Sequence, residues 1–135
     1  MDNKELIFLA FEAMEKAYAP YSGYKVGAAL LTEDGKVYTG CNIENAAYGP
    51  TNCAERTAFF KAVSEGERHF TAIAVVGGKD GKPHDYFYPC GVCRQVMAEF
   101  CGKDFEIITA VSQDDYVSVT LESLLPYGFG PDKLG

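Results

Sequence analysis

Two short cysteine motifs constrain the fold of this chain more than any other feature. The first is Cys-Ala-Glu at positions 53–55, and the second is Pro-Cys-Gly-Val-Cys at positions 89–93. Together they offer three thiolate ligands for a tetrahedral zinc ion, and a carboxylate that is not a ligand. Three protein ligands leave the fourth position open for water, which distinguishes a catalytic zinc site from a closed structural one. The fold therefore has to bring two distant segments to one point.

Both motifs stand where a helix is expected to begin. The predicted helices run from Cys53 to about Glu65, and from about Cys90 to Gly102. Helix N-termini carry unpaired N–H groups and the positive end of the helix dipole, which favour thiolates over thiols. Because C-x-x-C on one helical turn brings both sulfurs to one face, Cys93 and Cys90 are predicted to bind zinc together with Cys53. The metal is expected between two helix ends at one edge of a sheet, where open α/β folds commonly bind ligands.

The remaining chain alternates strand and helix signals. A helical pattern covers residues 3–18 and is ended by Pro20, and a short helix is expected over 121–125. The predicted strands cover residues 24–31, 37–43, 70–76, 105–111 and 116–120. Residues 77–88, rich in glycine, are expected to form a loop. This order predicts an α/β fold, a three-layer α/β/α domain around a mixed sheet of about five strands.

Length and composition limit the possible functions. The 135 residues are expected to form a single domain over 1–135, because no linker divides them. The net charge of −7 and the lack of a basic stripe argue against a nucleic-acid partner. No apolar run approaches the roughly 20 residues that span a bilayer, and the charged N-terminus does not resemble a signal peptide. We therefore expect a cytoplasmic protein that binds neither nucleic acid nor membrane.

Each residue of the motifs has a simpler interpretation when taken alone. Glu55 follows Asn52 by three residues, so it fits the N3 position of a helix start that resembles a capping box. C-x-x-C alone is ambiguous between a redox motif, a zinc site and coincidence. Arg56 alone is typical of a solvated helix residue, and Cys41 and Cys101 are interpreted as buried thiols. The conjunction of the two motifs, each before a helix, favours the catalytic zinc site.

Charge gives Arg56 a predicted role. Three thiolates and one Zn²⁺ leave a net negative charge, which weakens the metal as a Lewis acid. A guanidinium that donates to the thiolate sulfurs withdraws charge and restores that acidity. We therefore predict that Arg56 balances the charge of the metal site.

These residues resemble the cytidine deaminases, specifically the small homotetrameric class that acts on nucleosides. The resemblance covers nearly the whole chain, in the same order and with the same spacing. The similar segments are residues 18–22, 40–49, 53–58, 89–96, 124–126 and 129–131. Two features depart from the family pattern: Tyr88 replaces a residue that is usually small and hydroxylated, and the loop 78–88 is a little long. Both bear on the shape of the site's rim.

The resemblance implies a hydrolase of pyrimidine salvage, which converts cytidine or 2′-deoxycytidine and water into uridine or 2′-deoxyuridine and ammonia. Cys53, Cys90 and Cys93 would bind one zinc ion per subunit. Glu55 would be the catalytic residue, which takes a proton from water, delivers it to N3 of the ring and helps to protonate the departing amino group. Free nucleosides are favoured over nucleotides, because Glu44 and an acidic protein would repel a phosphate.

The resemblance also implies the residues that bind the substrate. Asn42 and Glu44 would hold ribose hydroxyls, and backbone groups around Ala54 would read the pyrimidine edge. Tyr24 would keep the aromatic face that is usual at its position. Phe129 would stack on the base from a neighbouring subunit, so that a homotetramer would complete each site.

Three alternatives stay open at this point. A deaminase of another aminopyrimidine nucleoside, such as blasticidin S, shares the metal motif, although Phe129 and the ribose segment favour cytidine. A deaminase that edits RNA or DNA is disfavoured by the acidity and small size of the chain. A non-enzymatic zinc-stabilised or thiol-redox domain leaves Glu55 unexplained, and a structural site would need Cys41 or Cys101 as its fourth ligand, close to the metal.

Overall fold

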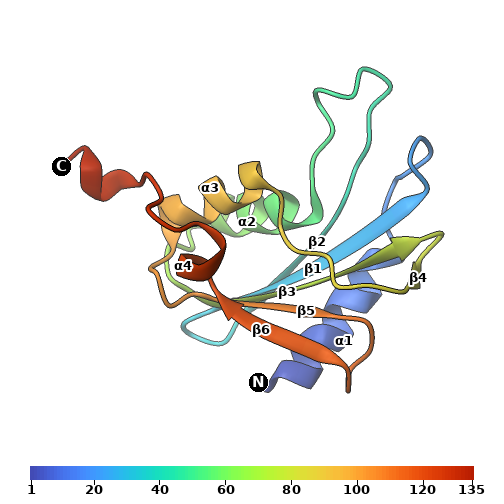
Figure 1. Cartoon of the computed structure of the whole chain (residues 1–135), viewed down its shortest axis with the longest axis horizontal. Helices are drawn as coiled ribbons and strands as arrows, with labels where there is room; N and C mark the ends of the chain where they lie inside the picture. Colours follow the sequence, from blue (N-terminus) through green and yellow to red (C-terminus); the bar gives the residue numbers. More distant parts are fainter.

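A mixed sheet runs through the centre of the structure, a computed structural model that describes residues 1–135 (Figure 1). Its five longer strands are β1 (Tyr24–Thr32), β2 (Val37–Cys41), β3 (Phe70–Lys79), β5 (Glu106–Ala110) and β6 (Tyr116–Thr120). They lie in the order β2-β1-β3-β5-β6, and the two-residue strand β4 (Lys82–Pro83) pairs with β3. β3 and β5 are parallel, whereas the other neighbours are antiparallel. The predicted mixed sheet is confirmed.

Helices cover both faces of this sheet. Helix α1 (Asn3–Met14) packs on one face, and α2 (Ala54–Ser64) and α3 (Gly91–Phe100) pack on the other (Figure 1). A short helix, α4 (Leu121–Leu124), and a 3₁₀ turn, η1 (Pro131–Lys133), follow the last strand. The three-layer α/β/α architecture is therefore confirmed. None of these helices combines the length and the apolar character that a membrane crossing requires.

The side chains of β3 contribute to the cores on both sides of the sheet. Ile73 and Val75 belong to the core that includes α2 and α3, whereas Ala72, Ala74 and Val76 belong to the core that includes α1. Successive side chains of a strand point to opposite faces, so both alternating sets are apolar when both faces are covered. The apolar run that predicted this strand is explained by its central position.

A glycine on β2 sets how closely α2 approaches the sheet. A Cβ atom at Gly40 would lie 2.5 Å from the carbonyl oxygen of Ala54 and 2.6 Å from the nitrogen of Ala58. No side chain fits into that space, because the backbone of the helix already fills it. Gly40 therefore allows the first turn of α2, which carries the first cysteine motif, to lie directly on β2.

Two predicted boundaries were wrong. The first helix ends at Met14 rather than near residue 18, because the backbone of Tyr18 already exchanges hydrogen bonds with that of Asn42 and Glu44. The second strand ends at Cys41 rather than at residue 43. Residue 43 forms only isolated bridges.

The expected loop over 77–88 is partly a β-hairpin. β3 continues to Lys79, which pairs with Lys82 across a two-residue turn. The turn residues Asp80 and Gly81 have φ angles of 55° and 76°. Positive φ at both positions is typical of the type I′ turn, for which Asp-Gly is a favoured sequence. The glycines before this turn suggested a loop and hid the hairpin.

Candidate active site

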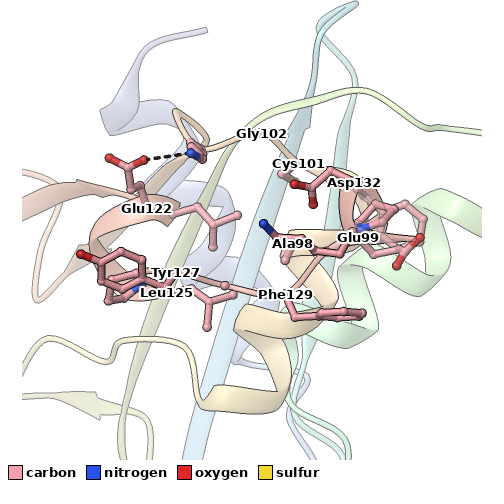
Figure 2. A pocket seen from close by; sticks show the side chains of 17 residues that line it. Ala98, Glu99, Cys101, Gly102, Glu122, Leu125, Tyr127, Phe129 and Asp132 are labelled. Atoms are coloured by element: carbon pink, nitrogen blue, oxygen red, sulfur yellow. Dashed lines mark ion pairs between the residues drawn. The ribbon is translucent and has the colours of Figure 1, made fainter. Parts of the chain in front are cut away.

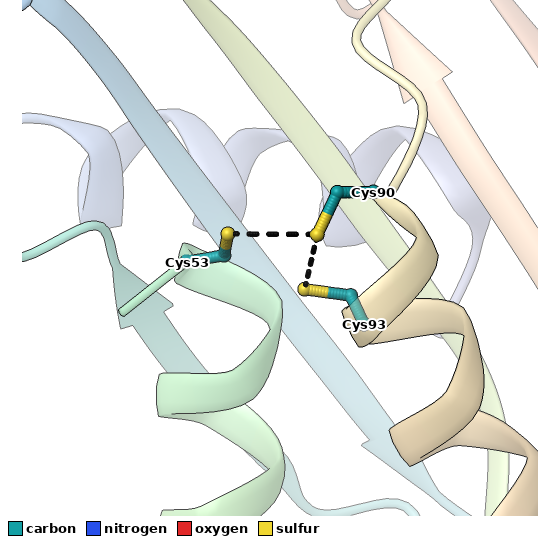
Figure 3. A group of neighbouring side chains, drawn as sticks. All are labelled: Cys53, Cys90 and Cys93. Atoms are coloured by element: carbon teal, nitrogen blue, oxygen red, sulfur yellow. Dashed lines mark hydrogen bonds between the residues drawn. The ribbon is translucent and has the colours of Figure 1, made fainter. Parts of the chain in front are cut away.

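The three predicted metal ligands converge at the starts of α2 and α3, with their sulfurs directed toward one another (Figure 3). Cys53 is the N-cap of α2, Cys90 is the N-cap of α3, and Cys93 lies in the first turn of α3. The Sγ atom of Cys90 lies 3.9 Å from that of Cys53 and 3.6 Å from that of Cys93. Two sulfurs bound to one tetrahedral zinc ion, each at about 2.3 Å, lie about 3.8 Å apart. The donor set and its spacing fit zinc.

Cys41 and Cys101 do not belong to this group of sulfurs. The cluster of possible metal ligands contains Cys53, Cys90 and Cys93 alone. A closed structural site, which would need a fourth cysteine, is therefore disfavoured. Burial raises the pKa of Cys101 to about 12, as expected for a thiol in an apolar environment.

Arg56 lies against the first of the three sulfurs. Its Nη2 atom donates a hydrogen bond to Sγ of Cys53 at 3.3 Å, and its Nε atom is buried without a partner. A hydrogen bond from Cys93 and the adjacent guanidinium lower the pKa of Cys53 to about 5. The predicted contact between the Arg56 guanidinium and a thiolate sulfur is therefore present. Its effect on the Lewis acidity of a bound zinc ion stays a prediction.

Glu55 is a buried carboxyl group beside the sulfurs, with an exposed fraction of 4%. Burial, together with the negative charge of the neighbouring Cys53 thiolate, raises its pKa to about 7. A carboxyl group in this range both accepts and releases a proton near neutral pH. The capping-box interpretation was wrong, because the N-cap of α2 is Cys53 rather than Asn52. The position of Glu55 is therefore not explained by helix capping.

A cavity of about 270 Å³ opens beside Glu55. Its walls are formed by Val26, Asn42, Glu44, Thr51, Asn52, Cys53, Ala54, Glu55, Val75, Phe87, Tyr88 and Cys90. Metal ligands, the buried carboxyl and both predicted ribose-binding residues thus line one space. No Lys or Arg is among them, so the walls offer no cation to a phosphate group.

The two predicted ribose-binding residues are fixed by hydrogen bonds to the backbone. The side chain of Asn42 accepts from the N–H of Val26 and donates to the carbonyl of Tyr24, both at 2.8 Å. The carboxylate of Glu44 accepts from the N–H groups of Tyr21 and Ser22 at 2.9 and 3.1 Å. A hydrogen bond from the Ser22 hydroxyl also lowers the pKa of Glu44. Both polar groups are therefore held in place before any ligand binds.

Two of the predicted substrate-binding residues do not line this cavity. Tyr24 lies outside its wall, with its ring centroid 6.1 Å from that of Phe87, which does line it. Phe129 lines a different hollow of about 850 Å³, between the end of α3 and the C-terminal segment (Figure 2). That larger hollow contains none of the three clustered cysteines. Within one chain, neither aromatic ring reaches the cavity.

Phe87 and Tyr88 are wall residues to which the sequence analysis gave no role. Tyr88 was noted only as a departure from the family pattern, and Phe87 lay in a segment expected to be a loop. Their position directly before Pro89 and Cys90 was the available signal, since the segment that leads to a metal ligand has to pass the site. Val26 and Val75 could not be identified from the sequence, because many buried strand residues share their pattern.

Residues 1–109 match the family model described as "Cytidine and deoxycytidylate deaminase zinc-binding region". The chain is 52% identical over 134 residues to a cytidine deaminase of Sporosarcina psychrophila, and the alignment covers 99% of this chain and 96% of that protein. It is 54% identical over 135 residues to a cytidine deaminase of Halalkalibacterium halodurans, with 99% and 98% covered.

Solved structures of cytidine deaminases are similar to this chain in both sequence and fold. The crystal structure of cytidine deaminase from Burkholderia pseudomallei is 51% identical, with a TM-score of 0.88 and coverage of 96% of this chain and 100% of that one. Cytidine deaminase from Mycobacterium tuberculosis is 41% identical, with a TM-score of 0.82 and coverage of 96% and 98%. Sequence and fold therefore agree along nearly the entire chain.

Proposed function

The chain belongs to the cytidine deaminase family, and on that premise we propose that it hydrolyses cytidine and 2′-deoxycytidine to uridine and 2′-deoxyuridine, with release of ammonia. One observation carries this proposal. Three clustered thiols, a buried carboxyl group and two fixed polar side chains meet at a cavity that offers no cation. This set suits a neutral, hydroxyl-bearing substrate whose reaction needs a metal and a proton carrier.

Cys53, Cys90 and Cys93 would hold one zinc ion in each subunit. When bound, the metal supplies a Lewis acid that makes a water molecule nucleophilic near neutral pH. Arg56 would offset the negative charge of the three thiolates through its hydrogen bond to Cys53. The side chain of Arg56 would thus act on the metal rather than on the substrate.

Glu55 would move the protons of the reaction. Its carboxylate accepts a proton from the attacking water, and the oxygen of that water forms a bond to C4 of the pyrimidine. The carboxyl group then passes the proton to N3 and assists in protonating the amino group at C4, which leaves as ammonia as the carbonyl forms. The raised pKa of about 7 supports this role, since neither protonation state is strongly disfavoured.

Asn42 and Glu44 would bind the ribose hydroxyls, and the backbone at Ala54 would bind the edge of the base. All three line the cavity. Asn42 uses one amide hydrogen on the carbonyl of Tyr24 and retains a second for the substrate. The negative charge of Glu44, with no Lys or Arg in the wall, favours free nucleosides over nucleotides.

The assembly that supports this function would be a homotetramer in which subunits complete each other's sites. The support is the position of Phe129, which is 55% exposed and separate from the cavity of its own chain. A ring at that place is available to a neighbouring subunit. We further propose that residues 1–135 act as one catalytic domain and that the protein works in the cytoplasm, where free thiols such as those of its five cysteines are retained.

The direct test is to incubate the zinc-loaded protein with cytidine and to follow the fall in near-ultraviolet absorbance as uridine forms. Glu55→Gln should retain zinc and lose a factor of about 10² to 10⁴ or more in rate. Glu65→Gln is the matched control, because Glu65 is an exposed residue at the end of the same helix.

The outcomes separate the alternatives. Conversion by the parent and by Glu65→Gln, but not by Glu55→Gln, supports both the reaction and the proton carrier. If the zinc-loaded parent protein leaves cytidine intact, the substrate would instead be another aminopyrimidine nucleoside. Near-normal turnover by Glu55→Gln would remove Glu55 from the mechanism.

A further inference from the structure

Residues 126–135 form a C-terminal segment that follows α4 and extends away from the sheet (Figure 1). Its residues are exposed, apart from Gly128 and Gly130. None of its hydrophobic side chains belongs to either apolar core. A hollow of about 850 Å³ lies between the segment and the end of α3 (Figure 2). Apolar packing therefore does not hold the segment in place.

Hydrogen bonds give the segment a single anchor on the rest of the chain. Its backbone–backbone bonds connect it only to itself and to Leu125. No ion pair includes any of its residues. The one bond to another helix comes from Gln95 on α3, whose Nε2 atom donates to the carbonyl oxygen of Phe129 at 2.8 Å. The position of the segment relative to α3 therefore depends on this bond.

Arg94, the neighbour of Gln95, fixes the start of the segment. Its Nε atom donates to the carbonyl oxygen of Pro89 at 2.7 Å, and its Nη1 atom donates to that of Leu124 at 2.8 Å. Leu124 ends α4 just before the segment, and Pro89 directly precedes a predicted metal ligand. The segment is thus joined to α3 at two points, at its start through Arg94 and at Phe129 through Gln95.

The bond from Gln95 holds the backbone of Phe129 and leaves its ring free. The ring is 55% exposed and does not line the cavity of its own chain. Gln95 lies two residues after Cys93, a predicted metal ligand. The first two turns of α3 therefore carry metal ligands of one site together with the anchor of a ring that is proposed to serve another site. An anchor on the backbone orients the ring without covering it.

We propose that Gln95 is a positioning residue for the site of the neighbouring subunit, because it fixes the backbone of Phe129. This inference rests on the proposed function and adds to it a residue that lies outside the cavity. A segment without this anchor would be free to move, and binding of a nucleoside would then have to order it. That cost falls on substrate binding, and the proton transfers at Glu55 do not depend on it. Loss of the bond should therefore raise KM more than it lowers kcat.

The first test measures KM and kcat for cytidine in two variants at position 95. Gln95→Glu has nearly the same shape but replaces the donating amide by an acceptor, and Gln95→Met removes both polar atoms. Each should raise KM about two- to tenfold, the range that one hydrogen bond contributes, with kcat and zinc content close to those of the parent. Gln113→Glu is the matched control, because the amide of Gln113 also donates to a backbone carbonyl, that of Lys4 at 3.0 Å. This control should keep the parental KM.

The second test asks whether position 95 acts through Phe129. Phe129→Ala removes the ring that the bond is proposed to position. In that background Gln95→Glu should change KM by less than about twofold, so the two substitutions are not additive. Equal effects of Gln95→Glu with and without the ring would mean that residue 95 does not act through Phe129.

The third test places the substitution and the working site in different subunits. Subunits that carry both Glu55→Gln and Gln95→Glu are co-expressed in excess with differently tagged parent subunits, and assemblies that contain both are purified. Only the parent sites turn over, and most of them face a neighbour whose C-terminal segment lacks its anchor. Their KM should rise as it does in Gln95→Glu itself. Partner subunits that carry Glu55→Gln alone should leave it at the parental value.

The outcomes separate this inference from the proposed function. A parent protein that leaves cytidine intact would overturn both. An active parent that stays a monomer in native mass spectrometry would overturn the proposed assembly and this inference, but not the reaction. An active, oligomeric parent whose position-95 variants keep its KM would overturn the inference alone. Mixed assemblies in which the parent sites keep the parental KM would do the same, since Gln95 would then act only within its own subunit.

Discussion

Replacing Gly40 by alanine is expected to impair catalysis although residue 40 lies outside the active-site cavity. The new Cβ atom would lie 2.5 Å from the carbonyl oxygen of Ala54. Ordinary van der Waals contact begins at 3.4 Å, so α2 and β2 have to separate by about 0.9 Å. The carbonyl oxygen of Ala54 and the nitrogen of Ala58 both belong to the backbone of α2, so no flexible side chain can move aside to make room. The displacement therefore moves the helix start that carries Cys53 and Glu55.

The size of the effect follows from this displacement. Misplacement of catalytic groups by about 1 Å can lower the rate by about 10²-fold, so we expect kcat/KM to fall by about 10- to 100-fold. Overpacking of this kind also costs about 1–3 kcal/mol of stability. In a chain of this size each kcal/mol lowers Tm by roughly 3–5 °C.

Initial rates of cytidine deamination, zinc content and Tm should be measured for Gly40→Ala beside Gly102→Ala. Gly102 is the matched control, because a Cβ atom there would meet no atom within 4 Å. Gly102→Ala should behave like the parent in all three measurements. Parental activity and Tm in Gly40→Ala would show that the close approach of α2 to β2 does not position the site.

Three further predictions concern the metal, protonation and substrate charge. In zinc-loaded protein Cys53 and Cys90 should resist alkylation at pH 7.5, and they should react once a chelator has removed the metal. Burial raises the pKa of Cys101 to about 12, so this thiol should stay unreactive with and without zinc. Peptide mass spectrometry would identify the alkylated cysteines. In metal-free protein burial raises the pKa of Glu55 from 4.5 to about 7, so stability should fall as pH rises through this range. The Tm values of the metal-free parent and of metal-free Glu55→Gln should then agree near pH 4.5, and by pH 8 the variant should have the higher Tm. Tm values that change with pH in the same way for both proteins would contradict the pKa shift. CMP should be deaminated with a kcat/KM at least about a hundredfold below that of cytidine, because Glu44 repels its phosphate and no cation lines the cavity.

The metal cluster could be predicted from the sequence because its geometry is local to two helix starts. Spacing alone places Cys90 and Cys93 on one turn, and the conjunction with Cys53 requires the two helix ends to meet. The structure brings these sulfurs to distances that suit one zinc ion. The sheet was equally predictable, since the apolar run of β3 implies cover on both faces.

The aromatic wall could not be predicted, because it depends on tertiary packing. Gly77 and Gly78 resemble loop residues in the sequence, but in the structure they belong to β3 and make room for other groups. Gly77 accommodates the Phe87 ring, and a Cβ atom at Gly78 would lie 2.1 Å from the carbonyl oxygen of Lys82. A glycine pattern predicts conformational freedom, but it does not tell which neighbour fills the space. The same limit explains why Tyr24, aromatic at the expected position, lies outside the cavity.

Two glycines therefore define two walls of one site in different ways. Gly40 lets the backbone of α2 approach β2, which positions the groups proposed to bind metal and to move protons. Gly77 lets the side chain of Phe87, a wall residue of the cavity, approach β3. The atoms that crowd position 40 belong to α2, and those that crowd position 77 belong to Phe87 and Val26. Because the two sets share no atom, substitution at Gly40, which moves the start of α2, should act mainly on kcat. Substitution at Gly77, which displaces the wall residues Phe87 and Val26, should act mainly on KM.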